Sequence, residues 1–289
     1  MRQPTLTERL QSALTVLHWG NLWVTIPLCV GAVIMMLPFL WMFSASLRPE
    51  GEAYRLPPSL LPDSWNPGSY QHALESGLPF VRMFCNSFVV AACSTAGVLL
   101  TASMAAFAFA RLRFSGAGPL FLIMLVGMMV PPALVLIPIY AGFAAIGLLD
   151  TPAALILPAL ASSFGVYMMR QFMLGQPRAL EEAAMIDGAG YWTIYWRISL
   201  PQLGPAMAAL GIITFTASWN NFIAPFVLIK SLEQMTLPIG IVALQGVFGG
   251  GELAVIMAAS VMAIMPLFVV FLVAQRFIIE GLTMTGIKG

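Results

Sequence analysis

Long runs of apolar residues alternate with short polar segments along the 289-residue chain. A helix needs about 20 mainly apolar residues to cross a bilayer. Six runs meet this requirement, and they predict membrane-spanning helices over residues 22–44, 84–110, 119–143, 151–173, 204–229 and 253–277. Prolines fall inside five of the six runs, which predicts kinked helices. The expected fold class is therefore an all-α membrane protein with six transmembrane helices.

The polar segments between the runs predict the division of the chain. Residues 47–79 are rich in proline and are expected to form an extramembrane loop with one helix near residues 69–75. We expect an N-terminal segment with the first span and this loop over residues 1–81, a permease domain over 82–277, and a tail over 278–289. The first 20 residues show no clear signal-peptide cleavage site, and either a short helix on the inner membrane face or a frayed tail is compatible with them.

Composition supports a membrane protein and excludes several other classes. The chain is 60% hydrophobic and 9% charged, whereas soluble domains average near 25% charged residues. The net charge of +1 argues against a nucleic-acid partner. His18 and His72 lie far apart, so no metal site is expected. Cys85 and Cys93 are separated by about 12 Å along one predicted helix and cannot form a disulfide there.

The basic residues predict the orientation, because cytoplasmic segments carry an excess of lysine and arginine. With the N-terminus in the cytoplasm, the inner segments hold nine basic residues and the outer segments four. The inner nine are Arg2, Arg9, Arg111, Arg113, Arg170, Arg178, Arg197, Arg276 and Lys288. Both termini are therefore expected in the cytoplasm.

Motifs of catalysis are absent from the sequence. There is no G-x-x-x-x-G-K-[ST] phosphate loop, no G-x-S-x-G elbow and no H-E-x-x-H pair. The chain is not expected to be an enzyme. A carrier driven by protons or sodium normally buries an acidic residue in a span, and none lies between the flanks of the six runs.

The polar segment at residues 178–205 predicts two short helices joined by a turn. Pro177 is expected at the first helical position, where its missing N–H costs little. Asp187-Gly188 is expected to end the first helix, since glycine accepts the left-handed conformation that a helix end often needs. Tyr191–Leu200 is expected to form the second helix, which Pro201 ends.

The first of these helices combines charge with small side chains. Glu181 and Glu182 fall in its early turns, where negative charge suits the helix dipole. Ala183 and Ala184 are strong helix formers with very little side chain. Such a compact segment suits docking into a groove on another protein, although shape alone leaves an ordinary solvated loop open.

The same loop carries a motif with fixed spacing. Glu182-Ala183-Ala184 is followed after three residues by Gly188, after nine more by Ile198, and after one more by Leu200-Pro201. This pattern resembles the EAA loop of ABC importer permeases, and Asp187 and Ala189 extend the match. Further matches to the carbohydrate-uptake branch of that family lie at residues 218–222 and 281–289, and the resemblance runs from about residue 84 to the C-terminus.

The resemblance implies the type I permease fold of ABC importers in a bacterial inner membrane. It implies that the loop is the coupling helix, which sits in a cleft of a cytoplasmic ATPase subunit. The implied partners are a second permease subunit, two ATPase subunits or a homodimer of one, and an extracytoplasmic sugar-binding protein. ATP and magnesium would belong to the ATPase subunits, with no cofactor in this chain. The implied coupling residues are Glu181, Glu182, Ala183, Ala184, Asp187 and Gly188.

Two further segments are candidate substrate or partner sites. Trp219-Asn220-Asn221 lies roughly 24 Å into the fifth span at about 1.5 Å per residue, where amides bind sugar hydroxyls or join helices. The outer segment 230–252 contains a glycine run and is expected to be flexible. The resemblance to maltose-type permeases implies that Gln245, Gly249, Gly250 and Gly251 reach into the binding protein, and a plain connector is the alternative. Weaker substrate candidates are Ser162, Ser163 and Tyr167.

The sequence does not name the transported sugar. An ABC importer of another solute, such as glycerol phosphate or an oligopeptide, is the alternative within the class. A secondary carrier that works alone and a structural membrane scaffold are the alternatives from other classes.

Overall fold

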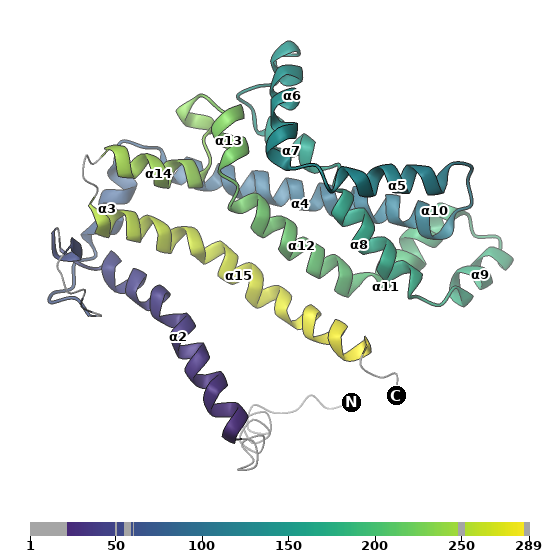
Figure 1. Cartoon of the computed structure of the whole chain (residues 1–289), viewed down its shortest axis with the longest axis horizontal. Helices are drawn as coiled ribbons and strands as arrows, with labels where there is room; N and C mark the ends of the chain where they lie inside the picture. Colours follow the sequence, from purple (N-terminus) through teal and green to yellow (C-terminus); the bar gives the residue numbers. More distant parts are fainter. Residues whose placement is uncertain (1–21, 50, 55–58, 60, 248–251, 286–289) are drawn as a thin grey trace. The chain divides into compact units, whose positions relative to one another are not determined.

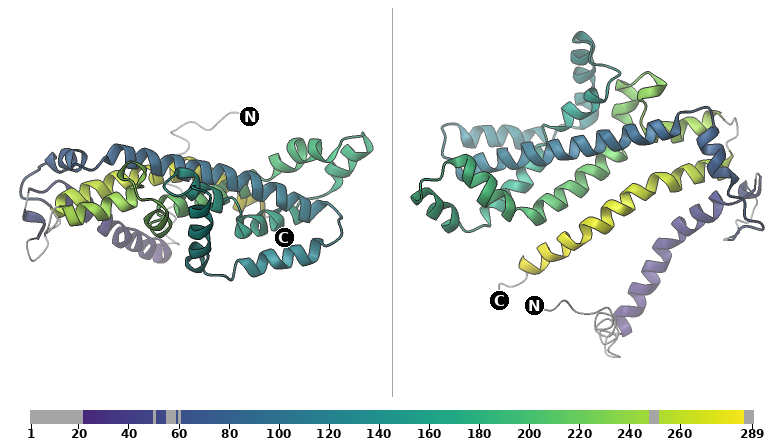
Figure 2. Two further views of the ribbon diagram at one scale, coloured as in Figure 1. Left: turned by 90° about the horizontal axis from the view of Figure 1, so that it is seen from above. Right: turned by 180° about the vertical axis from the view of Figure 1, so that it is seen from behind.

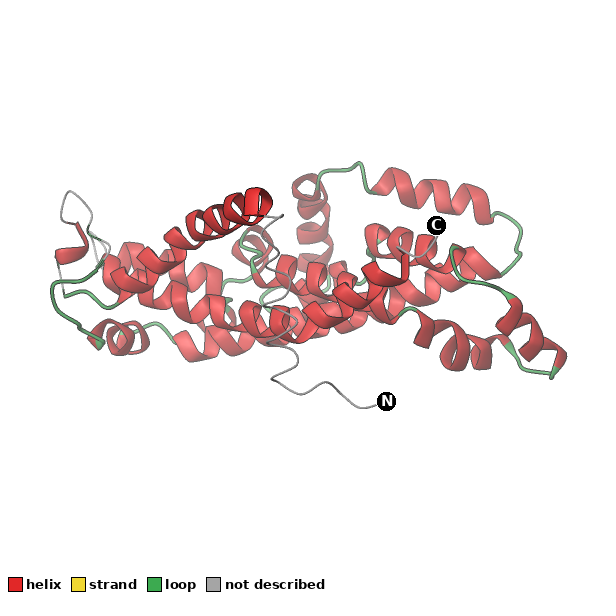
Figure 3. Ribbon diagram, turned by 90° about the horizontal axis from the view of Figure 1, so that it is seen from below, coloured by secondary structure: helices red, strands yellow, loops and turns green. Residues whose placement is uncertain are grey.

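The computed structural model describes residues 22–49, 51–54, 59, 61–247 and 252–285, and every regular element within these ranges is a helix (Figures 1 and 3). The fold class predicted from the sequence is confirmed in these residues. The chain divides into two units, residues 1–70 with 252–261 and residues 71–251 with 262–289. The expected N-terminal helix and the glycine run at 249–251 lie outside the described residues.

The first unit contains the apolar helix α2 and the polar segment that follows it. Helix α2 spans Leu22–Ser46 and includes Pro27 and Pro38. The polar segment forms the short helix η2, Glu52–Tyr54, and begins α3, Gly68–Glu75, close to the predicted helix at 69–75. A backbone hydrogen bond joins the start of this polar segment to the residues just before α3, since the Asn66 backbone N–H donates to the Leu47 carbonyl over 2.7 Å.

Helix α4 spans Phe80–Arg111 and has 32 residues. It is the longest of the described helices that lie entirely in the second unit. At 1.5 Å per residue it is about 48 Å long, enough to cross a bilayer. One face carries small buried residues at intervals of four: Ser94, Val98, Ala102, Ala106 and Ala110. Small side chains let helix backbones approach closely in a membrane, and α4 packs against α7, α8 and α12.

Two predicted spans are broken helices. The run at 119–143 forms α5, Ala117–Gly127, and α6, Pro132–Ala145, with a bend of 101° between them. The run at 151–173 forms α7, Pro152–Ala159, and α8, Ser163–Leu174, with a bend of 40°. New helices start where Thr151 and Ser162 accept backbone N–H groups as N-caps. Pro131-Pro132 causes the sharper bend, because neither proline continues a helix from the preceding turn.

The predicted fifth span, residues 204–229, is also interrupted. Helix α12 spans Gly204–Trp219 and α13 spans Ile223–Leu228. The outer segment 230–252 was expected to be flexible because of its glycine run, and no helix was predicted in it. It contains η4, Leu232–Gln234, and the 11-residue apolar helix α14, Leu237–Val247.

Helix α15, Leu253–Thr285, continues past residue 277, where the sixth span was predicted to end. Part of the expected tail at 278–289 is therefore helical. Among the described residues, three helices are long and apolar enough to cross a membrane, and the number rises to six if each of three bent pairs is one span. The third bent pair joins 191–202 to α12 at 76°, so it starts earlier in the chain than the predicted fifth span.

The hydrophobic core of the second unit gathers at one end of α4. Tyr195 lies near its centre, 2% exposed, with its hydroxyl 2.8 Å from Ser103 Oγ and its ring 5.5 Å from that of Phe107. Figure 2 shows the short helices of the loop at 178–203 beside this end of α4. The buried members of the core are Val98, Ala102, Ala106, Phe107, Ala110, Val166, Met169, Met173, Ile194, Tyr195, Leu203, Ala206 and Leu210.

Candidate coupling surface

The first helix of the loop, α9, spans Ala179–Ile186. It starts two residues after Pro177, so the predicted place of this proline at the first helical position is wrong. The predicted stop is confirmed: Gly188 has φ +83°, and its N–H donates to Met185 O while Ala189 N–H donates to Ala184 O over 2.9 Å. These two bonds define a Schellman motif, in which a left-handed residue satisfies the last helix carbonyls.

The second half of the loop is one continuous helical path of three types. It comprises α10, Tyr191–Ile194, the π-helix η3, Tyr195–Ser199, and α11, Leu200–Gln202. The prediction that Pro201 ends this helix is wrong, because the path continues to Gln202. In the wider π turn, Leu200 N–H donates to Tyr195 O. The helix α11 begins at Leu200, so Pro201 lies in the first turn of a helix, where proline is tolerated.

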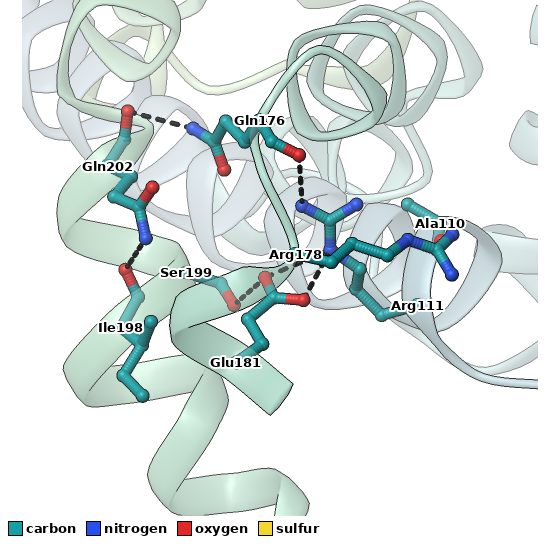
Figure 4. A network of polar contacts seen from close by, with 8 residues as sticks. All are labelled: Ala110, Arg111, Gln176, Arg178, Glu181, Ile198, Ser199 and Gln202. Atoms are coloured by element: carbon teal, nitrogen blue, oxygen red, sulfur yellow. Dashed lines mark hydrogen bonds and ion pairs between the residues drawn. The ribbon is translucent and has the colours of Figure 1, made fainter. Parts of the chain in front are cut away.

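Glu181 points into the protein. Its side chain is 4% exposed, and one of its carboxylate oxygens lies 2.7 Å from Nε of Arg111, which is 3% exposed. Ser199 Oγ also donates to this carboxylate, over 2.9 Å. Figure 4 shows that the three side chains come from α4, α9 and η3, which converge here. Breaking a buried ion pair by removing one partner costs about 3–5 kcal/mol, so the pair fixes α9 against the end of α4.

Neighbouring polar groups extend this contact (Figure 4). Arg178 donates to the Ala110 carbonyl over 3.1 Å, which joins the start of α9 to the end of α4. The amide of Gln176 donates to the Gln202 carbonyl over 3.0 Å, which joins the chain after α8 to the end of α11. These contacts therefore hold the loop near both of its ends.

The opposite face of α9 is exposed. Glu182, Ala183 and Asp187 are exposed, while Ala184 is half-buried and packs against the core. Ile186 is 87% exposed, and Leu180 and Met185 are also exposed. The face therefore combines exposed apolar side chains with two acidic ones, Glu182 and Asp187. We define Leu180, Glu182, Ala183, Met185, Ile186 and Asp187 as the α9 surface.

The sequence grouped Glu181 with Glu182 and did not identify Leu180, Met185 and Ile186 as members of the α9 surface. Arg111 could have indicated that Glu181 is buried. It lies at the end of a long apolar span, and a buried arginine there needs a carboxylate partner. No pattern in eight residues separates an apolar residue that faces the core from one that faces outward. The roles of the six implied coupling residues stay predictions.

Trp219, Asn220 and Asn221 lie at the break between α12 and α13. The indole of Trp219 is 2% exposed, donates to the Ala263 carbonyl over 3.0 Å and packs edge-on against Phe84. It offers no free stacking face here and has the contacts of a packing residue. Asn220 and Asn221 are exposed, and Asn221 Oδ1 accepts the Ala224 N–H and so caps α13.

The remaining candidates are separated along the second unit. Ser162 caps α8, and Tyr167 is 39% exposed on the same helix. Gln245 is exposed near the end of α14. The start of α14 is joined to α4, because Ser87 Oγ accepts the Leu237 N–H over 2.7 Å.

The apolar helices, several of them in bent pairs, define the class of this protein as a membrane protein with several spans. Residues 97–282 match the family described as "Binding-protein-dependent transport system inner membrane component", and the chain belongs to this family. The loop with α9 and most of the spans lie inside the matched region.

Similar proteins include several sugar permeases. The chain is 35% identical over 269 residues to the arabinooligosaccharides transport system permease protein AraQ of Halalkalibacterium halodurans, covering 92% of this chain and 96% of that protein. It is 32% identical to the diacetylchitobiose uptake system permease protein NgcG of Streptomyces coelicolor, covering 86% and 83%. It is 30% identical to the sn-glycerol-3-phosphate transport system permease protein UgpE of Yersinia pestis, covering 89% and 94%.

A solved structure shares the fold. It is a chain in the crystal structure of a bacterial ABC transporter involved in the import of the acidic polysaccharide alginate, with a TM-score of 0.76 and 22% identity over 96% of this chain and 99% of that chain. The fold of this protein is therefore that of an ABC importer permease.

Proposed function

We propose that this chain is a transmembrane subunit of an ATP-driven importer that carries a sugar across the inner membrane. The relatives named for arabinooligosaccharide and diacetylchitobiose transport support a saccharide as the solute. A binding protein outside the membrane would deliver the sugar. A second permease subunit, or a second copy of this chain, would complete the pathway.

The observation that carries this proposal is the two-sided construction of α9. Its outer side, the α9 surface, combines exposed apolar side chains with Glu182 and Asp187. Its inner side holds Glu181 in the ion pair with Arg111. A partner that pushes on the α9 surface therefore acts on α4, which lies along the second unit.

The proposed partner on this surface is an ATPase subunit. Exposed apolar residues ringed by polar groups mark protein interaction sites, and the acidic residues would meet basic residues in the partner's groove. ATP and magnesium would be bound by that subunit. The basic residues predict that the loop lies in the cytoplasm, which is where ATP is available.

Reconstitution tests the proposed function. The chain is assembled with the ATPase, the second permease and the binding protein in liposomes that enclose ATP. We expect neutral oligosaccharide to accumulate only with binding protein and ATP present, and glycerol phosphate serves as the competing solute. Uptake that needs an ion gradient and no ATPase subunit would identify a secondary carrier, and preferred uptake of glycerol phosphate would overturn the sugar assignment.

A further inference from the structure

A partly open cavity of about 290 Å³ lies in the second unit among α4, α7, α12 and α13, and Thr236, just before α14, completes its lining. Small-ligand pockets measure about 300–1,000 Å³, so this cavity lies at the lower edge of that range and suits no more than one small ring. None of its lining residues is charged. Six carry hydroxyl groups, namely Ser87, Ser94, Ser162, Thr214, Ser218 and Thr236.

The regular spacing of α4 places its share of the lining on one face. Ser87, Val90, Ser94 and Val98 all line the cavity and are separated by three or four residues. Residues at this spacing lie one above another on a helix. The stripe is about 16 Å long at 1.5 Å per residue, and it alternates hydroxyl with apolar side chains.

Two of the hydroxyl groups are buried without a partner. Ser94 is 1% exposed and Thr236 is 3% exposed, and neither hydroxyl oxygen has a hydrogen-bond partner among the described residues. Buried polar groups are normally hydrogen-bonded, so such exceptions need an explanation. A polar ligand that enters the cavity would supply the missing partners.

Two other hydroxyl groups of the lining donate to no group among the residues that the structure describes. Ser87 Oγ accepts the Leu237 N–H over 2.7 Å, and Ser162 Oγ accepts the Gly165 N–H over 3.0 Å. A serine hydroxyl has one donor and two acceptor positions, so both retain their O–H for a ligand. The cavity therefore offers donors and acceptors together, without a charge.

We propose that this cavity binds one ring of an uncharged sugar during transport. The proposal rests on the proposed function and deepens it, since it assigns direct sugar contact to this subunit. Sugar hydroxyls donate and accept as the lining hydroxyls do, and the C–H faces of a ring suit apolar lining residues such as Val90 and Leu155. Phosphates and carboxylates are recognised by arginine, lysine or several converging N–H donors, and the lining has no such basic residue.

The chain offers a matched control on α4. Thr95 also has a buried hydroxyl oxygen without a hydrogen-bond partner among the described residues, but it does not line the cavity. Thr95→Val and Thr236→Val are the same nearly isosteric change and remove the same kind of group. Only the second removes a hydroxyl from the cavity, and Ser94→Ala removes another.

The test measures uptake of neutral oligosaccharide by the assembled transporter in ATP-loaded liposomes with saturating loaded binding protein. Rates are divided by the amount of assembled transporter. Each lost hydrogen bond to an uncharged group corresponds to about a two- to tenfold effect. We expect such a loss for Ser94→Ala and for Thr236→Val, a larger loss for both together, and wild-type uptake for Thr95→Val.

The melting temperature of each variant separates binding from folding. Removing an unpaired hydroxyl leaves no partner unsatisfied, so the sugar-free variants are expected to melt at the wild-type temperature or above. Wild-type uptake by the double variant would overturn the proposal and leave a cavity that holds only water. Equal losses in Thr95→Val, or melting temperatures that fall with uptake, would also overturn it. If the wild-type transporter itself takes up no sugar, the proposed function fails together with this site.

Discussion

Adjacent residues in α9 have opposite environments. Glu181 is buried in an ion pair with Arg111, whereas Glu182 is exposed. The sequence shows two consecutive acidic residues and predicts charge near the helix start, but only the packing of α9 on α4 decides which of them faces inward. The role of each residue in this loop therefore depends on which side of α9 packs against α4.

Replacing Glu181 by alanine is expected to destabilise the second unit by about 3–5 kcal/mol, because Arg111 is left buried without its partner. Replacing both residues, as Glu181→Leu with Arg111→Met, is expected to recover most of this loss. Glu182→Ala is the matched control and is expected to stay within about 0.5 kcal/mol of wild type. The melting temperature of the purified transporter measures all three, and equal losses from Glu181→Ala and Glu182→Ala would contradict the buried pair.

Glu182→Lys is expected to uncouple transport while the subunit still inserts into the membrane. A reversed charge in a desolvated interface pair costs on the order of 2–5 kcal/mol. Sugar uptake and co-purification of the ATPase subunit are the measurements. Normal values of both would show that Glu182 does not face the ATPase.

Gly188 tests the backbone of the turn, because a side chain there would meet no atom within 4 Å. At φ +83° a β-branched residue is strained, while asparagine is tolerated several times more often. Gly188→Val is therefore expected to reduce uptake more than Gly188→Asn. The two variants are compared by uptake per assembled transporter, and equal rates would mean that the left-handed turn has no role in coupling.

Elements separated in the sequence are joined by single side chains. Asp150, in the connection between α6 and α7, accepts the N–H groups of Lys230 and Ser231 over 2.9 Å each. These hydrogen bonds hold the pKa of the Asp150 carboxyl below its ordinary value. Asp150 also has φ +63°, which aspartate and asparagine tolerate better than most residues.

A lowered folded-state pKa means that the carboxylate stabilises the fold above about pH 4, the ordinary aspartate pKa. The stabilisation is lost as the pH falls through the folded-state value. Asp150→Asn keeps the backbone preference and one acceptor oxygen, so it removes mainly the charge. We expect a lower melting temperature than wild type at pH 7, and a difference that shrinks below about pH 4 and disappears once the pH is below the folded-state pKa. A difference that is constant with pH would contradict a role for the ionised group.

Helix α4 connects the loop to the opposite end of the second unit. Its last residue, Arg111, holds Glu181, and near its first turn Asn86 donates to the carbonyls of Glu233 and Met235. The sequence predicted this span because its apolar run is continuous. It did not predict the contacts with the segment before α14, since Asn86 gives no signal of a partner 147 residues away.

At the scale of the whole molecule, the length of the apolar runs predicted where the spans lie. It did not predict where a span is broken into two helices. The prolines predicted the interruption at Pro131-Pro132. The break at Asn220-Asn221 was not predicted, because run length does not show the packing that compensates the freed backbone groups. The helix α14 was missed because a glycine run next to it indicated flexibility. The turn at Gly188 was predicted correctly, because glycine's tolerance of positive φ is a local property.

The central claim is that the α9 surface docks on the ATPase subunit, and photo-crosslinking in the assembled transporter tests it most directly. A photoreactive phenylalanine replaces Ile186, which is 87% exposed on α9, or Trp65, which is 64% exposed in the predicted outer segment. We predict a crosslink to the ATPase subunit from position 186 and none from position 65. No ATPase crosslink from position 186 in a transporter that still hydrolyses ATP with loaded binding protein would contradict the account.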